Sequence, residues 1–292
     1  MSRSRAAWWF IAPAVIVLAV FFFLPVLGAL VMSLTDFDLY ALSDYHNLRF
    51  VGFENYGRLL GEPLFWKALG NTLYFVALGV PLSIGASLGA ALLVDSRLAR
   101  YRAFFRTVFF APVVTTLVAV AVVWRYIFHT RYGFLNYALG GVGIGPIDWM
   151  GDPHWAMPAI VILAVWKNFG YNMIILLAAL QNIPEDLYEA ARIDGASSWQ
   201  VFRHITLPGL APVLLLVSIL TITGYFQLFA EPYVMTEGGP LQSTLSVLYF
   251  MYEEGFKWWS LGRASAVAFL LFVLMFVVTV AQLRIGRRQA GA

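Results

Sequence analysis

The chain has 292 residues, of which 61% are hydrophobic and 12% are Asp, Glu, Lys or Arg, and its formal net charge is +3. Soluble domains have about 45–50% apolar and about 25% charged residues, so this composition excludes a water-soluble protein and indicates a membrane protein. The absence of cysteine excludes disulfides and thiolate metal sites, and so small a net charge gives no support for a nucleic-acid partner.

Apolar runs long enough to cross the hydrocarbon layer, which takes about 20 helical residues, occur six times along the chain. The predicted spans are 7–34, 69–94, 104–128, 156–181, 207–230 and 264–283. The first run is too long for the apolar region of a signal peptide, so it is predicted to be an uncleaved helix. We therefore expect an all-α integral membrane protein with one transmembrane domain over residues 1–292 and no soluble domain.

The distribution of charged residues predicts the orientation of these spans. If the N-terminus is inside, the inner segments carry eleven arginines against five acidic residues, and the outer segments carry seven basic residues against eleven acidic ones. Because Lys and Arg collect on the cytoplasmic side of membrane proteins, both termini are expected to be cytoplasmic. Lys167 remains as a charge within the fourth span.

The loop between the fourth and fifth spans carries helix signals of its own. Pro184 suits a first helical turn, Gly195 suits a left-handed C-terminal cap, and Ser197 with Gln200 has the spacing of a capping box. These signals predict two short helices on the cytoplasmic side, the second ending before Pro208. The apolar side chains of this hairpin favour docking of another protein, but packing against the inner ends of the chain's own spans would explain them as well.

Polar side chains at mid-depth in two spans are candidates for substrate contact. Lys167 lies about 16 Å below the outer end of its predicted span, and it should face protein or a water-filled cavity because a lysine in lipid is costly. Asn168 and Tyr171 lie on the same side of that helix, and Thr221 and Tyr225 are one turn apart in the fifth span. Amide, hydroxyl and aromatic groups suit a neutral sugar, while the lysine favours an acidic or phosphorylated one. The alternative is that these groups make interhelical hydrogen bonds, or that Lys167 pairs with a carboxylate.

The cytoplasmic loop resembles the signature of permease subunits of binding-protein-dependent ABC importers. The matching positions, in the pattern E-A-A-x3-G-x9-I-x-L-P, are Glu189, Ala190, Ala191, Gly195, Ile205, Leu207 and Pro208. Two more stretches, VGFENY at 51–56 and FAEPYVMTEGGP at 229–240, resemble segments of the carbohydrate-importing branch, which includes permeases of the maltose, glycerol 3-phosphate and lactose type.

The resemblance implies a type I importer permease fold with six transmembrane helices and a coupling-helix hairpin over residues 182–207. It implies a path for a carbohydrate that an extracytoplasmic binding protein delivers across a bacterial or archaeal inner membrane. The implied partners are two cytoplasmic ATPase subunits and a second, homologous permease subunit. The implied ATPase-docking residues are Glu189, Ala190, Ala191, Asp194 and Gly195. In maltose-type permeases the helices on either side of the coupling loop line the sugar site, which favours Lys167, Asn168, Tyr171, Thr221 and Tyr225 as substrate-binding residues.

The sequence offers no motif for chemistry of its own. It contains no G-x-x-x-x-G-K-[ST] phosphate loop, no H-E-x-x-H pair and no G-x-S-x-G elbow. We therefore expect no enzyme activity and no cofactor or metal on this chain, with ATP and Mg²⁺ held by the partner ATPases. A stand-alone secondary transporter is the main alternative, and a polytopic membrane enzyme is another. A secondary transporter usually has acidic residues within its spans, and the six predicted spans have none at depth.

Overall fold

The computed structural model describes residues 3–96 and 101–290. Its described part is helical, with backbone pairing of the β type limited to one isolated bridge between Thr35 and Phe50. The all-α prediction is therefore confirmed. The extreme ends of the chain lie outside the described residues, so the cytoplasmic location of both termini stays a prediction.

Contacts divide the chain into two units, residues 1–66 with 250–274 and residues 67–249 with 275–292. The boundaries fall inside three helices, α5 (Pro63–Asp95), α14 (Val247–Tyr252) and α15 (Leu261–Ala290). No linker separates the two units, and the expectation of one transmembrane domain over residues 1–292 stays a prediction.

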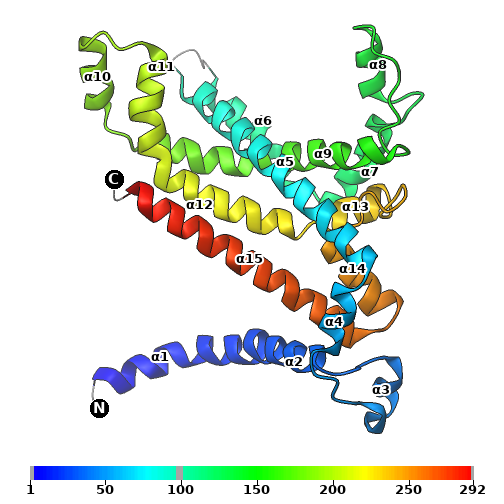
Figure 1. Ribbon diagram of the computed structural model, residues 1–292. Helices are drawn as coiled ribbons and strands as arrows, with labels where there is room; N and C mark the ends of the chain where they lie inside the picture. Colours follow the sequence, from blue (N-terminus) through cyan, green and yellow to red (C-terminus); the bar gives the residue numbers. More distant parts are fainter. Residues whose placement is uncertain (1–2, 97–100, 291–292) are drawn as a thin grey trace. The chain divides into compact units, whose positions relative to one another are not determined.

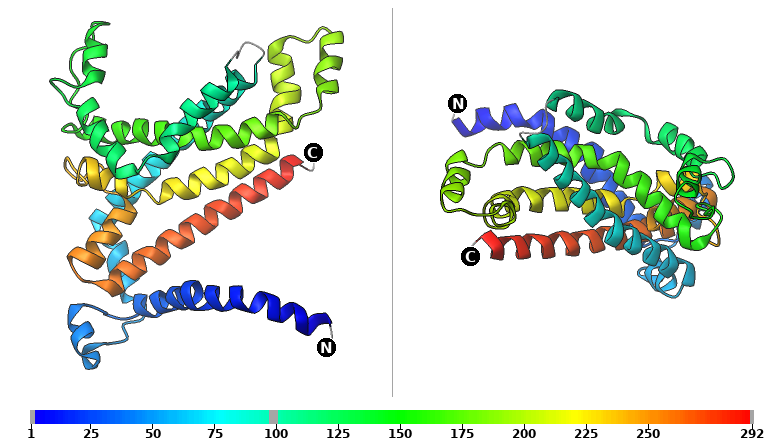
Figure 2. Two further views of the ribbon diagram at one scale, coloured as in Figure 1. Left: turned by 180° about the vertical axis from the view of Figure 1, so that it is seen from behind. Right: turned by 90° about the horizontal axis from the view of Figure 1, so that it is seen from above.

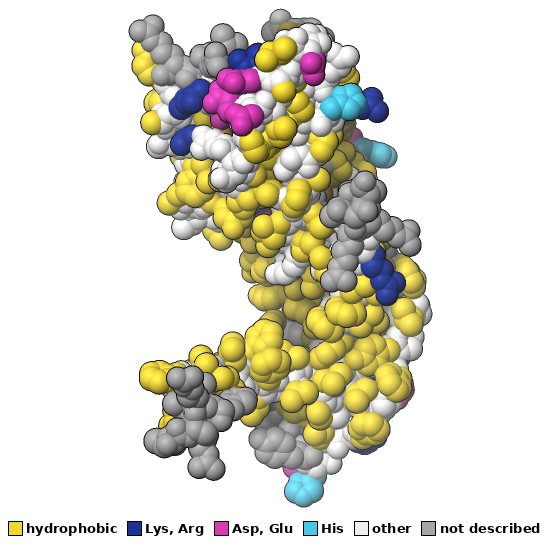
Figure 3. Space-filling view, turned by 90° about the vertical axis from the view of Figure 1, so that its left-hand side faces the viewer, with side chains coloured by type: hydrophobic (Ala, Val, Ile, Leu, Met, Phe, Trp, Pro, Cys, Tyr) yellow, Lys and Arg dark blue, Asp and Glu magenta, His cyan; other side chains and the backbone are white. Residues whose placement is uncertain are grey.

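Five helical segments of the described chain are long and apolar enough to cross a membrane, and each coincides with a predicted span. They are Trp9–Ser33, Pro63–Asp95, Pro153–Leu180, Ser198–Phe226 and Leu261–Gly286. Hydrophobic side chains cover most of the face shown in Figure 3. Phe10 and Phe21 in the first segment are 87% and 76% exposed, as side chains that contact lipid or another subunit would be.

The third predicted span, 104–128, is not one straight helix. It consists of α6 (Arg102–Val114) and α7 (Leu117–Ile127), which are bent by 100° at Thr115 and Thr116, both in extended backbone conformation. The Thr115 hydroxyl donates a hydrogen bond of 2.6 Å to the Pro112 carbonyl oxygen and so ends the helix locally. Hydropathy alone does not reveal this break because the residues on both sides are apolar.

The first unit contains the N-terminal span and the short elements that follow it. These are α1 (Arg3–Leu18), the π turn η1 (Ala19–Phe23), α2 (Leu24–Ser33), α3 (Leu39–Ser43), the 3-10 turn η2 (Tyr45–Asn47), α4 (Glu54–Leu60) and the π turn η4 (Glu253–Lys257). Figure 1 shows α1 and α2 as one continuous helical path.

The VGFENY stretch fixes the end of this first span. The buried Asn55 amide donates to the carbonyl oxygens of Ser33 and Thr35 at 2.9 and 2.8 Å, and the Tyr56 hydroxyl lies 2.8 Å from the Ser33 hydroxyl. Gly52 turns the chain with a φ of +59°, a conformation that favours glycine. The motif therefore has a structural role, since it satisfies carbonyl groups that the helix end leaves without a partner.

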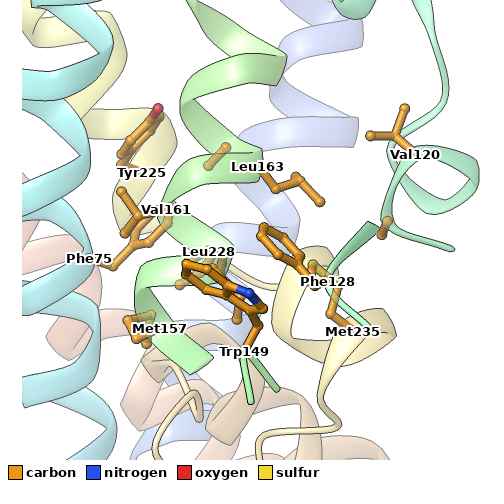
Figure 4. Close-up of a cluster of buried hydrophobic side chains, with 14 of the residues drawn as sticks. Phe75, Val120, Phe128, Trp149, Met157, Val161, Leu163, Tyr225, Leu228 and Met235 are labelled. Carbon is orange, nitrogen blue, oxygen red and sulfur yellow. The ribbon is translucent and has the colours of Figure 1, made fainter. Parts of the chain in front are cut away.

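The second unit holds the remaining spans and loops. Its further elements are α8 (Phe134–Gly140), α9 (Pro153–Leu180), α10 (Glu185–Ile193), α11 (Ser198–Val201), the π turn η3 (Phe202–Thr206), α12 (Leu207–Phe226) and α13 (Ala230–Met235). Figure 1 and the reverse view in Figure 2 show α9 and α12 side by side, and α6 packs against α9. One apolar core of this unit gathers Phe128, Trp149 and Met235 from separate segments, with the Phe128 and Trp149 ring centres 5.5 Å apart (Figure 4).

We had expected the second helix of the loop between the fourth and fifth predicted spans to end before Pro208, and this prediction is wrong. The helix continues from α11 through η3 into α12, and Pro208 occupies the first turn of α12. A proline within a helix clashes with the carbonyl of the preceding turn, and the wider π turn gives that carbonyl room. The same arrangement occurs at η1, which is followed by Pro25.

The crossing of α6 and α9 depends on Gly170. A methyl group at this position would overlap the Phe109 carbonyl oxygen of α6. We expect Gly170→Ala to lower the stability of the protein by about 1–3 kcal/mol, as overpacking does, and thermal unfolding of the purified protein in detergent would measure it. Gly85→Ala is the matched control, because a methyl group at that helical position meets no other atom of the described chain. Equal melting temperatures for the two variants would contradict the assignment of this contact.

Candidate functional site

A cavity of 490 Å³ lies within the second unit, among α9, α12 and the segment that follows α12. Its wall is completed by single residues of α5, α7 and α14. The lining residues are Phe75, Leu117, Ala164, Asn168, Tyr171, Asn172, Leu220, Thr221, Gly224, Tyr225, Gln227, Leu228, Phe229, Ala230, Glu231 and Leu248. A mainly apolar wall with a few polar groups is typical of a site for a small molecule.

Four of the five residues predicted to contact substrate line this cavity: Asn168, Tyr171, Thr221 and Tyr225. Asn168 donates to the Ala164 carbonyl of its own helix at 3.0 Å. Tyr171 is 49% exposed, so its ring is open to a solute. These residues come from α9 and α12, which bring the two polar patches of the sequence together.

Thr221 is partly occupied by an interhelical contact. The buried Asn172 amide donates to the Thr221 hydroxyl oxygen at 2.9 Å, which joins α9 to α12 at the cavity wall. Asn172 was not among the predicted residues, although it is one residue beyond Tyr171. The interhelical alternative is thus realised for Thr221, while its position in the wall leaves its hydroxyl next to the cavity.

Tyr225 is held by aromatic and glycine contacts. Its ring centre lies 5.0 Å from that of Phe75, and Figure 4 shows both rings with Val161 beside them. A methyl group at Gly79 would come within 2.7 Å of the Tyr225 ring, so glycine allows α5 to approach it. The hydroxyl is buried close to Ser83 and Asn168 and makes no well-formed hydrogen bond with either.

Lys167, the fifth predicted residue, does not line the cavity. It is buried, and its ammonium donates to the Val113 carbonyl oxygen at 3.1 Å. Val113 is in the last turn of α6, where carbonyl groups have no helical partner and the helix dipole favours a positive charge. Lys167 therefore caps the broken end of α6, and this contact explains its depth in the span without a substrate.

Glu231, in α13 just after the fifth span, lines the cavity and was missed as a candidate. Burial raises the pKa of its carboxyl above the ordinary value, and the nearby Lys167 ammonium opposes that shift. The two charges therefore influence each other, while the hydrogen bond of the Lys167 ammonium goes to the Val113 carbonyl oxygen. The resemblance of FAEPYVMTEGGP to a family segment was the available signal, but it gave no role to any single residue.

The loop between the fourth and fifth predicted spans has the predicted caps. Gly195 follows α10 with a φ of +73°, and Ser197 and Gln200 form the capping box of α11 with bonds of 2.7 and 3.4 Å. Pro184 immediately precedes α10 instead of lying in its first turn. The predicted first helix and the caps at Gly195 and Ser197 are therefore confirmed, while the second helix of the loop is the start of the longer path into α12.

The predicted docking residues form part of an exposed surface. Glu189, Ala190, Asp194 and Gly195 are exposed, and Ala191 is half-buried. The neighbouring apolar side chains of Leu187, Ile193 and Trp199 are 49%, 86% and 65% exposed. On the opposite side of the loop, the Tyr188 hydroxyl lies 3.2 Å from the Thr206 hydroxyl beside a cavity of 1140 Å³. Packing against the chain's own helix ends is therefore found for Tyr188, and docking of another protein stays a prediction for the exposed side chains.

Comparison with known proteins defines the class to which this fold and these sites belong. The sequence profile of the family described as "binding-protein-dependent transport system inner membrane component" matches residues 79–291. The chain belongs to this family and is a multi-pass inner-membrane subunit of a transport system, not an enzyme.

Relatives match nearly the whole chain. The lactose transport system permease protein of Rhizobium radiobacter is 38% identical over 287 residues, which cover 97% of this chain and 94% of that protein. The trehalose/maltose transport system permease protein of Thermococcus litoralis is 36% identical over 285 residues, covering 98% and 95%. The sulfoquinovosyl glycerol transport system permease protein of Agrobacterium fabrum is 34% identical over 277 residues, covering 95% and 89%.

The fold also matches a solved structure. A chain of a bacterial ABC transporter involved in the import of the acidic polysaccharide alginate superposes with a TM-score of 0.83 and 22% identity, over 98% of this chain and 96% of that chain. This likeness confirms the importer permease fold.

The role of Lys167 can be tested by replacing its charge. We expect Lys167→Met to lower the stability of the detergent-purified protein by about 1 kcal/mol, because the Val113 carbonyl loses its cation. Lys167→Arg keeps the cation and should retain most of the stability. Thermal unfolding measures both variants. If Lys167→Met were more stable than the native protein, burial of the lysine would destabilise the protein more than its contact with Val113 stabilises it, and the capping role would be contradicted.

Proposed function

We propose that this chain forms the membrane path for a carbohydrate in an ATP-driven importer. The observation that carries the proposal is the cavity wall, where amide, hydroxyl and aromatic side chains of α9 and α12 converge. Sugar hydroxyls need donors and acceptors, and the C–H faces of a sugar pack on aromatic rings. The names of the relatives, which refer to lactose and to trehalose and maltose transport, support the same substrate class.

We further propose that α10 and Gly195 dock on a cytoplasmic ATPase subunit. Glu189 supplies an exposed carboxylate for a charge-assisted hydrogen bond, and the small Ala190, Ala191 and Gly195 permit close approach. The exposed Leu187, Ile193 and Trp199 supply apolar area around them. Docking on a cytoplasmic ATPase requires the loop to lie in the cytoplasm, and in this proposal both termini lie there as well.

The complete transporter in this proposal has four further components. Two ATPase subunits hold ATP and Mg²⁺, a homologous permease subunit supplies the second docking loop, and an extracytoplasmic binding protein delivers the carbohydrate. The family description, which names dependence on a binding protein, supports the last of these. We propose no cofactor for this chain itself.

A stand-alone secondary transporter has less support. Such a protein needs an ion-coupling group within its spans, and Glu231 lies just beyond the end of the fifth span. The exposed apolar loop would have no occupant in a protein that works alone.

Purification of the tagged protein from its native host tests the assembly. Stoichiometric ATPase, second permease and binding protein should accompany it. We expect Glu189→Ala and Gly195→Leu to reduce ATP-driven uptake in proteoliposomes at least about tenfold, or to release the ATPase. Glu189→Ala removes the docking carboxylate, and Gly195→Leu strains a left-handed position by about 1–2 kcal/mol.

Two controls separate docking from a general loss of charge or structure. Asp186→Ala removes an exposed acid of the same helix outside the docking set and should leave uptake near the native rate. Gly195→Asn should retain more activity than Gly195→Leu, because Asn tolerates the left-handed conformation. Full uptake by Glu189→Ala and Gly195→Leu would refute the docking role.

The proposed role of the cavity in carbohydrate uptake can be tested separately, by substituting the residues that line it. Removing a polar or aromatic group with Asn168→Ala, Tyr171→Ala, Thr221→Val or Tyr225→Ala should weaken carbohydrate uptake about three- to tenfold each, as the loss of one hydrogen bond or ring contact does. Tyr137→Ala is the control, since this tyrosine is 82% exposed and outside the cavity. The carbohydrate concentration giving half-maximal uptake is the measurement. No change in any of the four variants, with normal assembly, would mean that the path runs elsewhere.

A further inference from the structure

Among the described residues that line the cavity, Glu231 is the one with a carboxyl, ammonium, guanidinium or imidazole group. The other polar lining groups of the cavity are amides, hydroxyls and backbone. Glu231 lies in α13, a few residues beyond the end of α12, and is half-buried in the wall. Any charge selectivity of this cavity therefore depends on a carboxyl group.

Lys167, which the sequence predicts to contact the substrate, points its positive charge away from the cavity. The Lys167 ammonium is bonded to the Val113 carbonyl at the end of α6, and Lys167 is not part of the cavity wall. Its charge acts on Glu231 from behind this wall and opposes the rise in the pKa of this carboxyl that burial causes. A bound anion would therefore meet the carboxyl of Glu231 before it met the ammonium of Lys167.

The electrostatic consequence is a preference between solutes of similar shape. In a partly enclosed site a like charge raises the energy of an anion considerably more than it would in water. A neutral polyol has no such penalty, and it can donate its hydroxyl hydrogens to a carboxylate in strong bonds. The geometry thus reverses the expectation that Lys167 favours an acidic or phosphorylated substrate.

We propose that Glu231 is a specificity-determining residue, which makes this cavity accept neutral carbohydrates and disfavour anionic ones such as uronates, sulfonated sugars and sugar phosphates. This inference rests on the proposed carbohydrate path for its substrate class. The charge preference of the cavity is a separate property, and it can be measured without knowing the substrate.

The absence of cysteine from the chain makes a direct measurement possible. A single Leu220→Cys substitution places a thiol in the cavity wall. In membrane vesicles that contain the complete transporter at pH 8, this thiol is treated with two methanethiosulfonates of similar size, a cationic trimethylammonium ethyl reagent and an anionic sulfonatoethyl reagent. Mass spectrometry of this chain at successive times gives the rate of labelling by each reagent.

We expect Glu231→Gln to lower the ratio of cationic to anionic labelling at least about threefold, because it removes the charge and keeps the shape. Glu231→Asp keeps the charge and should leave the ratio close to its original value. Glu237→Gln is the matched control. It removes the same charge from an exposed position six residues further on, outside the cavity, and should change the ratio little.

An unchanged or increased ratio in Glu231→Gln would overturn the proposal, and so would an equal fall in Glu237→Gln. If neither reagent labelled Leu220→Cys or a second reporter, Asn168→Cys, the cavity would be closed to solutes and the proposal would also fail. Labelling that follows Glu231 in a transporter that imports no carbohydrate would instead contradict the proposed function and leave the charge preference intact.

Discussion

Backbone carbonyl groups at the break between α6 and α7 need hydrogen-bond partners, because a span offers them no water. Thr115 satisfies the Pro112 carbonyl through both its backbone amide, at 3.3 Å, and its hydroxyl. Lys167 satisfies the Val113 carbonyl from the neighbouring α9. The break sets the course of α7, and α7 in turn packs against α13. The position of Glu231 in the cavity wall therefore depends on a cap that lies behind this wall.

The helices that carry the cavity residues also lead to the loop between the fourth and fifth predicted spans. Thr221 and Tyr225 belong to the helical path Ser198–Phe226, which begins within the loop and has no break along its length. At 1.5 Å per residue, about 35 Å separates its start from Thr221. The π turn widens this path before Pro208 but does not interrupt it. A displacement of the loop by a docked protein would therefore be transmitted to the cavity by one rigid element, without a hinge at the loop.

Features with local causes could be predicted from the sequence. The spans follow from apolar length, and the hairpin follows from Gly195 and the Ser197 capping box, since each depends on residues within one helical turn. The break at Thr115 was missed because both sides are apolar and the cause is a side-chain hydrogen bond. The continuity of α11 with α12 was missed because a proline normally ends a helix, and a π turn is not visible in composition.

The cavity shows a second limit, which concerns side chains distant in sequence. Asn168, Tyr171, Thr221 and Tyr225 could be chosen because polar groups at mid-depth in a span are few. Position along a helix does not reveal what a long side chain reaches, however, and Lys167 reaches away from the cavity towards a carbonyl that exists only because another span is broken. Glu231 follows its span by a few residues and so was counted with the outer acids. Its place in the wall arises from the packing of α13 against α7, which no pattern in either segment predicts. A charge within a span thus indicates a polar requirement nearby, and only the tertiary contacts decide whether the backbone or a solute has that requirement.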